Sequence, residues 1–115
     1  MLLVYTEESQ MEAATSEMLQ QVAEGHHAVQ EEARRAGALV ASDPLARTAT
    51  ATTVRVRAGR RTVFDGPFAE TKEQLAGCYI LDCRDLDEAI AWAEKIPTAC
   101  AGGVGSVEIR PMRFQ

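Results

Sequence analysis

Two segments of this 115-residue chain, residues 1–6 and 75–83, read as β-strands that are apolar on both faces. Successive side chains of a strand point to opposite sides of its sheet, so Leu3 and Val4 face opposite ways. An antiparallel sheet with one face in water instead alternates between apolar and polar residues. The sequence therefore predicts a sheet that is covered on both faces.

Two amphipathic helices supply the cover for one of these faces. Residues 16–36 repeat apolar side chains at intervals of three and four, and Gly37 stands at the C-cap position of this helix. Asp85 is placed to cap a second helix, with Glu88 as its reciprocal capping partner and Pro97 as its stop. Both helices are long enough to pack across a sheet.

The order of the elements selects the fold. Residues 38–41 are predicted as an edge strand that is interrupted at residues 42–44. Residues 48–57 and 61–64 are predicted as a hairpin, and residues 105–111 as a final strand. This is the βαββαβ order of a ferredoxin-like α+β sandwich with an inserted hairpin. Right-handed crossovers put both helices on one face of the sheet. A second copy packed sheet to sheet would cover the other face, so a homodimer is expected.

Composition and charge exclude several classes of protein. A chain of 115 residues supports one domain, residues 1–115, and a net charge of −5 argues against non-specific nucleic-acid binding. No apolar run is long enough to cross a membrane, and the acidic residues that soon follow residues 1–6 do not fit a signal peptide. The three cysteines are odd in number and lack C-x-x-C spacing. A cytoplasmic protein without a metal or other cofactor is expected.

Residues 65–77, DGPFAETKEQLAG, combine a turn, an aromatic residue, four charges and a return to apolar strand. This motif resembles the DGPF-domain branch of the YCII-related family. The resemblance extends to further segments, at residues 50–55, 85–89, 91–93, 96–97 and 105–111. It implies a dimeric ferredoxin-like α/β barrel without an assigned activity in most members. Members include a dehydrochlorinase of aromatic catabolism, and DGPF proteins are often encoded near extracytoplasmic-function sigma factors.

The resemblance also suggests a catalytic pair. In the other YCII-related branch, a histidine on the first helix is proposed to act with an aspartate in a cleft beside the sheet. His26, 11 positions before Gly37, matches its place, and Asp65 is the candidate partner. A histidine titrates near neutral pH and suits general acid/base work. The alternatives are a packed His26 with a local hydrogen bond, an Asp65 that accepts bonds from its own turn, and a solvated His27.

Four further residues are candidates for substrate binding. Phe68 either roofs a pocket or, as we prefer, packs in the dimer interface. Glu70 and Lys72 belong to an expected short helical turn and either line a polar pocket or face solvent. Tyr79, like Tyr5, offers a phenol to a ligand or packs in the core with a polar tip.

Two other features have a structural and a functional interpretation. Four arginines cluster on the predicted hairpin, at positions 55, 57, 60 and 61. They either protect an exposed strand edge or grip an anionic ligand or partner, and edge protection is preferred. Burial is expected for Cys78 and Cys83, and Cys100 beside a loop is the thiol to test for reactivity.

The sequence leaves three functions open. The first is cofactor-independent acid/base catalysis of the lyase, isomerase or dehydrohalogenase type on a small organic anion, with His26 and Asp65 as the acting groups. The second is a non-catalytic binding or regulatory protein, linked to a sigma factor, whose hairpin or Phe68 loop contacts another protein. The third is a family member without a working site. The identity of the ligand and the pathway do not follow from the sequence.

Overall fold

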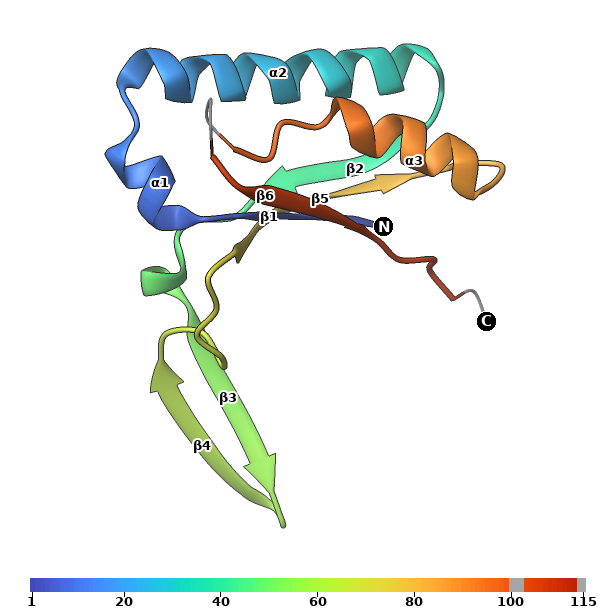
Figure 1. Ribbon diagram of the computed structural model, residues 1–115. Coiled ribbons are helices and arrows are strands. Elements are labelled where there is room, and N and C mark those ends of the chain that lie inside the picture. Colours follow the sequence, from blue (N-terminus) through green and yellow to red (C-terminus); the bar gives the residue numbers. More distant parts are fainter. Residues whose placement is uncertain (100–102, 114–115) are drawn as a thin grey trace.

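The computed structural model describes residues 1–99 and 103–113 (Figure 1). Its elements, in chain order, are β1 (Leu2–Thr6), α1 (Glu8–Ala13), α2 (Ser16–Arg35), β2 (Leu39–Pro44), η1 (Thr48–Thr50), β3 (Thr52–Arg57), β4 (Arg60–Asp65), β5 (Gln74–Leu81), α3 (Leu86–Lys95) and β6 (Gly105–Ile109).

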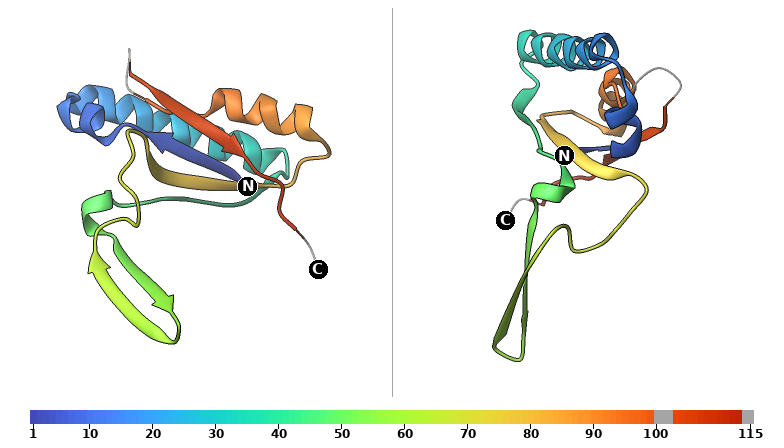
Figure 2. Two further views of the ribbon diagram at one scale, coloured as in Figure 1. Left: turned by 60° about the horizontal axis from the view of Figure 1, so that its bottom comes forward. Right: turned by 90° about the vertical axis from the view of Figure 1, so that its left-hand side faces the viewer.

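The main sheet is antiparallel, with the strand order β2-β5-β1-β6. Counted without the β3–β4 hairpin, this is the ferredoxin-like arrangement, and the predicted α+β fold is confirmed. Helices α2 and α3 lie on one face of the sheet, while β3 and β4 form a separate two-stranded sheet that extends away from the other face (Figures 1 and 2). The hairpin is inserted between β2 and β5, as expected.

Strand register explains why both faces of the sheet are apolar. Leu2 pairs with Tyr79, and both side chains are buried under the helices. Leu3 pairs with Cys78 on the opposite face, which no helix covers. A register shift between Val4 and Tyr5 follows, and it keeps Tyr5 opposite Leu75 on this open face. We call the surface of Leu3, Tyr5, Leu75, Cys78 and Ile80 the open sheet face.

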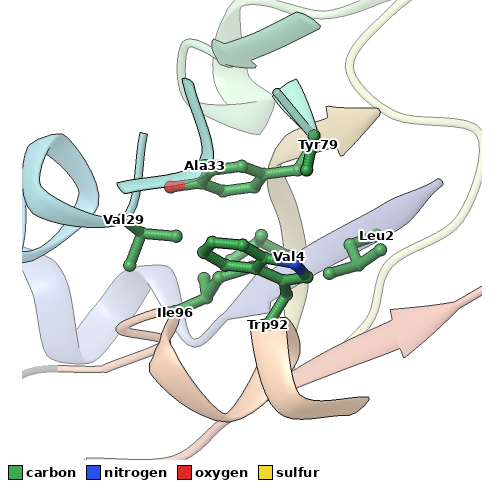
Figure 3. Close-up of a cluster of buried hydrophobic side chains, with 8 residues drawn as sticks. Leu2, Val4, Val29, Ala33, Tyr79, Trp92 and Ile96 are labelled. Carbon is green, nitrogen blue, oxygen red and sulfur yellow. The ribbon is translucent and has the colours of Figure 1, made fainter. Parts of the chain in front are cut away.

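The core lies between the sheet and the two helices. Its buried members come from β1, α2, β5 and α3 and from the segments that follow the two helices (Figure 3); they are Leu2, Val4, Val29, Ala33, Ala38, Tyr79, Trp92 and Ile96. The apolar stripes of the two helices therefore pack on the strand residues that point to the same side of the sheet.

Helix ends follow the predicted signals with one difference. Gly37 has a positive φ of 72°, as the C-cap prediction requires. The Asp85 side chain accepts a 2.9 Å hydrogen bond from the Glu88 amide. The Glu88 carboxylate, however, accepts from the Arg84 amide, so the reciprocal bond is made one residue before the cap.

Local structure departs from the expectation in four places. Strand β2 continues through Pro44, because Asp43 and Pro44 pair with β5. Residues 48–50 form a 3-10 turn before β3. Residues 70–73 form no helical turn and bend at 72 and 73, and helix α1 was not predicted. Cys100 lies outside the described residues.

Gly25 allows α2 to approach the segment after α3. A β-carbon at this position would lie 2.8 Å from Cγ of Pro97. We expect Gly25→Val to lower the free energy of unfolding by about 1–3 kcal/mol, because an overpacked contact must open. Urea denaturation measures the effect. The matched control is Ala28→Val on the exposed side of the same helix, which should cost about 0.5 kcal/mol from helix propensity. Equal losses in the two variants would contradict the close contact.

Candidate functional site

A cleft of about 510 Å³ lies between α2 and the end of the sheet where β1 and β2 finish. Most of its lining is apolar and comes from α1, α2 and the strand ends, including Met11, Leu19, Val22, Pro44 and Leu45. None of the described lining residues is Lys or Arg. The polar lining includes a group of four side chains, His26, Gln30, Ser42 and Tyr79.

His26 and Tyr79 meet in this cleft. The Nδ1 atom of His26 lies 2.7 Å from the Tyr79 hydroxyl, and the two rings are stacked with centroids 6.0 Å apart. Helix α2 presents His26 one turn before the buried Val29, on the side that faces the sheet. Tyr79 points to the same side because it pairs with the buried Leu2.

Two further side chains extend this contact into a chain of hydrogen bonds. Gln30, one helical turn after His26, donates from Nε2 to the Ser42 hydroxyl at 3.0 Å. Ser42 is opposite Tyr79 in the β2–β5 register and donates to its phenol oxygen, a bond that lowers the pKa of Tyr79. Donation therefore runs in one direction, from Gln30 through Ser42 and Tyr79 to His26, and such chains strengthen each bond.

A backbone group fixes the tautomer of His26. The ring is hydrogen-bonded to the backbone of Pro97. Proline has no N–H, so its carbonyl must accept and the imidazole must donate. A neutral ring has one N–H, and once it is given to Pro97, Nδ1 is left to accept the Tyr79 proton.

Burial sets the protonation of the pair. It lowers the pKa of His26 below the ordinary 6.5, and the Pro97 hydrogen bond opposes that shift in part. Burial also raises the pKa of Tyr79 above 10.0, against the smaller effect of Ser42. At neutral pH the site therefore holds a neutral imidazole that can accept a proton and a protonated phenol that can donate one.

Comparison with known proteins places this chain in a family. Residues 1–113 match the YCII-related domain. The chain belongs to the YCII-related family. A similar protein is the uncharacterized protein R00369 of Rhizobium meliloti (strain 1021), which is 42% identical over 111 residues, covering 96% of this chain and 89% of that protein.

The other predicted site residues of this YCII-related protein lie outside the cleft of their own chain. Asp65 is exposed at the end of β4, opposite Thr52, and within the described part of the chain its carboxylate makes no hydrogen bond. Phe68 is 74% exposed, and Glu70 and Lys72 are exposed in the loop before β5. The structure thus brings His26 and Tyr79 together and separates both from Asp65 and the loop residues.

One carboxylate, that of Asp43, occurs among the described lining residues. Asp43 is opposite Cys78 in the strand register, so its side chain belongs to the open sheet face, away from the face on which Tyr79 lies. The aspartate expected beside the histidine is therefore not supplied by this position.

Sequence reasoning missed Gln30 and Ser42. The position of Gln30, four residues after His26 on one helix face, was a usable signal. Ser42 had none, because it stood in the segment that was expected to interrupt β2. Its role depends on its pairing with Tyr79, which is a long-range feature of the sheet.

Within the described ranges, no cluster of three or more His, Cys, Asp or Glu side chains is placed to hold a metal ion. No helix in these ranges has the length and apolar character needed to cross a membrane. Cys78 and Cys83 are free and partly buried, and burial, followed by the charges of Glu88 and Asp82, raises the pKa of Cys83. That thiol is a poor nucleophile at neutral pH.

The lowered pKa of His26 makes stability depend on pH. Below about pH 6.5 the unfolded chain binds a proton at this residue before the folded chain does, so the folded state loses stability as the pH falls through the folded pKa. We expect His26→Gln to reduce the loss between pH 7.5 and pH 5.5. Urea denaturation of both proteins at the two pH values measures it, since all other titrating groups are shared. Parallel losses would contradict the assignment.

Proposed function

We propose that this YCII-related protein binds a small organic molecule in the His26 cleft and moves a proton on it by cofactor-independent acid/base chemistry. The reaction is of the lyase, isomerase or dehydrohalogenase type. The observation that supports it is the 2.7 Å contact between Nδ1 of His26 and the Tyr79 hydroxyl inside a cleft. When the ligand binds, the contact between Nδ1 and the Tyr79 hydroxyl opens. Nδ1 of His26 then takes a proton from the ligand and the Tyr79 hydroxyl returns one, and transfer of a proton from the imidazolium to the phenolate restores the pair. Ser42 and Gln30 orient the phenol.

The lining narrows the class of ligand. It is largely apolar and, in its described part, lacks Lys and Arg, while the pKa of His26 is lowered. A full negative charge would therefore be poorly compensated by this chain alone. A neutral or weakly acidic molecule with one polar group fits better than the organic anion expected from the sequence. The polar group would bond to the His26–Tyr79 pair while the rest contacts apolar side chains such as Leu19 and Val22.

A homodimer is part of this proposal. The open sheet face presents apolar residues to solvent on the side opposite the helices. A second copy stacked on it would bury these residues and hold the strand ends that form the cleft.

The test is proton exchange on a bound compound. A library of small carbonyl and halogenated compounds, neutral and acidic, is first screened by NMR with 15N-labelled protein for shifts at the His26 and Gln30 amides. Compounds that bind are then incubated with the protein in D2O, and deuterium incorporation at their acidic C–H groups is followed. We expect enzyme-dependent exchange. Compounds that bind elsewhere, or that bind here and exchange at the rate of the buffer, would contradict the proposal.

The rival function is a non-catalytic partner protein, linked to a sigma factor as the resemblance suggests. One observation favours it, the exposure of Phe68 and of the hairpin valines, which no part of the same chain covers in the described structure. A pull-down with wild-type protein and with Phe68→Asp separates the two functions. Capture of a sigma factor by the wild type alone supports the rival, and recovery of nothing but this chain counts against it.

A further inference from the structure

The β3–β4 hairpin exposes apolar side chains to solvent and is not part of the main sheet. Val54, Val56 and Val63 are 56%, 68% and 51% exposed, and the hairpin stands away from the two layers (Figures 1 and 2). A two-stranded hairpin alone in water is marginally stable. The radius of gyration is 15.9 Å, against about 13 Å for a compact chain of this length. These features leave the hairpin as an arm whose valines are not covered by the described part of its own chain.

The arm has two chemically different faces. Val54 is opposite Val63 and Val56 is opposite Arg61, so the valines share one face with Arg61 at the tip and with the pair Thr52–Asp65 at the base of the arm. The other face carries the pairs Arg55–Thr62 and Arg57–Arg60 towards the tip and Thr53–Phe64 at the base. A partner surface must therefore be apolar with acidic groups close by.

The charge of the chain is divided between the arm and the rest. Residues 52–65 carry four arginines and one carboxylate, a net +3. The whole chain has a net charge of −5, so the remainder carries −8. A second copy of this chain therefore offers the arm a surface of opposite sign.

The body of the chain has a groove of matching chemistry. Its volume is about 670 Å³, and its apolar lining includes Val40, Ile80, Leu86, Ile109 and Met112. Asp82 and Asp85 lie on its wall. Arg110 also lines it, but is ion-paired with Glu108, and the N-terminal ammonium donates to the Arg110 carbonyl. Val40 and Leu86 are largely exposed, so the groove has room for further apolar side chains.

The arm and the groove lie at opposite ends of the sheet. The arm leaves from the end marked by Thr6, Pro44 and Gln74, and the groove is at the end marked by Leu2 and Leu81. The open sheet face lies between them. Two copies can pack with their open sheet faces together and with the twofold axis perpendicular to the strands. Each arm then lies at the groove end of the other copy. An axis along the strands would instead set two arms of charge +3 side by side.

We propose that the β3–β4 arm docks on a second copy of this chain, with Val54, Val56 and Val63 in the groove and Arg61 facing its acidic wall. The contact is reciprocal, so a dimer contains two of them. It makes Arg61 a recognition element of the dimer, where the sequence favoured protection of a strand edge. The other three arginines of the cluster lie on the opposite face and contribute to the positive charge of the arm. The proposal is independent of the chemistry assigned to His26.

The first experiment compares two neighbouring substitutions on one strand. Sedimentation equilibrium should give the wild type as a dimer of about twice 12.5 kDa at micromolar concentration. Val63→Asp places a charge on the docking face and should raise the dimer dissociation constant by about 100-fold or more, since each dimer contains the change twice. Thr62→Asp, on the opposite face of the arm, should stay within about threefold of wild type. Circular dichroism verifies that both variants are folded.

The second experiment exchanges the charges. Arg61→Glu makes the docking face of the arm acidic, and Asp82→Lys makes the groove wall basic. Each variant alone should dimerise more weakly than wild type, because equal charges then meet. A mixture of the two should form a heterodimer of near wild-type affinity, since both arm-to-groove contacts regain opposite charges. The heterodimer supports arm-to-groove docking, because a dimer held by the open sheet face alone would not respond to the exchange.

Four results would overturn the proposal. They are a monomeric wild type at 100 µM, dimers of Val63→Asp as stable as the wild type, charge-reversed variants that still pair with themselves at wild-type affinity, and a mixture without heterodimer. A monomeric protein whose arm binds RNA or a different acidic protein would show that the arm docks on that partner. This result would also contradict docking on a second copy of the chain.

Discussion

Replacing His26 with glutamine is expected to lower the rate of proton exchange on a bound compound by about 100- to 10,000-fold, the usual contribution of a positioned acid or base. Glutamine is long enough to bond to the Pro97 carbonyl and fills a similar space. It has no group that accepts a proton near neutral pH. Folding and ligand binding should therefore survive while the chemical step is lost.

The kinetic pattern distinguishes this role from simple packing. A catalytic base gives a large fall in kcat with a small change in KM, and the rate of the wild type should fall as acid protonates the imidazole. Glu24→Gln, on an exposed part of the same helix, is the matched control and should keep the wild-type rate. A His26→Gln variant within threefold of the wild type would show that the chemistry, if present, depends on other groups.

The elements that were predicted correctly are those with a long, regular apolar pattern. The α2 stripe, the capping residue Asp85 and the two-sided apolar pattern of β1 predicted the two layers, because each pattern is set by local geometry alone. Helix α1 carried no such pattern. It has six residues and buries none of them; the Glu8 carboxylate holds it by accepting from the amide and hydroxyl of Thr48, both at 2.8 Å. A contact across 40 residues cannot be read from a short local window.

The same limit separates the two halves of the candidate site. His26 could be placed on the sheet side of α2 by periodicity, and Tyr79 on β5 by alternation. Their 2.7 Å contact depends on how helix α2 crosses the sheet, and the role of Ser42 depends on the register between β2 and β5. Neither can be read from a local pattern. Asp65 illustrates the converse. It lies in the most distinctive motif of the chain, but the hairpin that carries it points away from the layers, and the direction of a hairpin is a tertiary feature (Figure 1).

Substituting Trp92 by alanine is expected to lower the free energy of unfolding by about 3–5 kcal/mol, the usual cost of removing a large buried aromatic side chain. Trp92 is 8% exposed and packs in the core with Leu2 and Val4 (Figure 3). The Lys95 ammonium lies 5.0 Å from the centre of its ring, so a cation–π contact of about 0.5–1 kcal/mol is lost as well. A loss of this size is a large share of the total of about 5–15 kcal/mol for a typical domain.

The effect should also reach the candidate site, because Trp92 and Ile96 share the core cluster, and the next residue, Pro97, supplies the carbonyl that fixes the tautomer of His26. Urea denaturation at one fixed protein concentration measures the stability, and 15N chemical shifts of the imidazole report the tautomer. Trp92→Phe retains most of the volume and should lose less than half as much, while Glu94→Ala on the exposed side of α3 should change little. A Trp92→Ala loss below about 1 kcal/mol, with the imidazole signals unchanged, would mean that α3 supports neither the core nor the histidine.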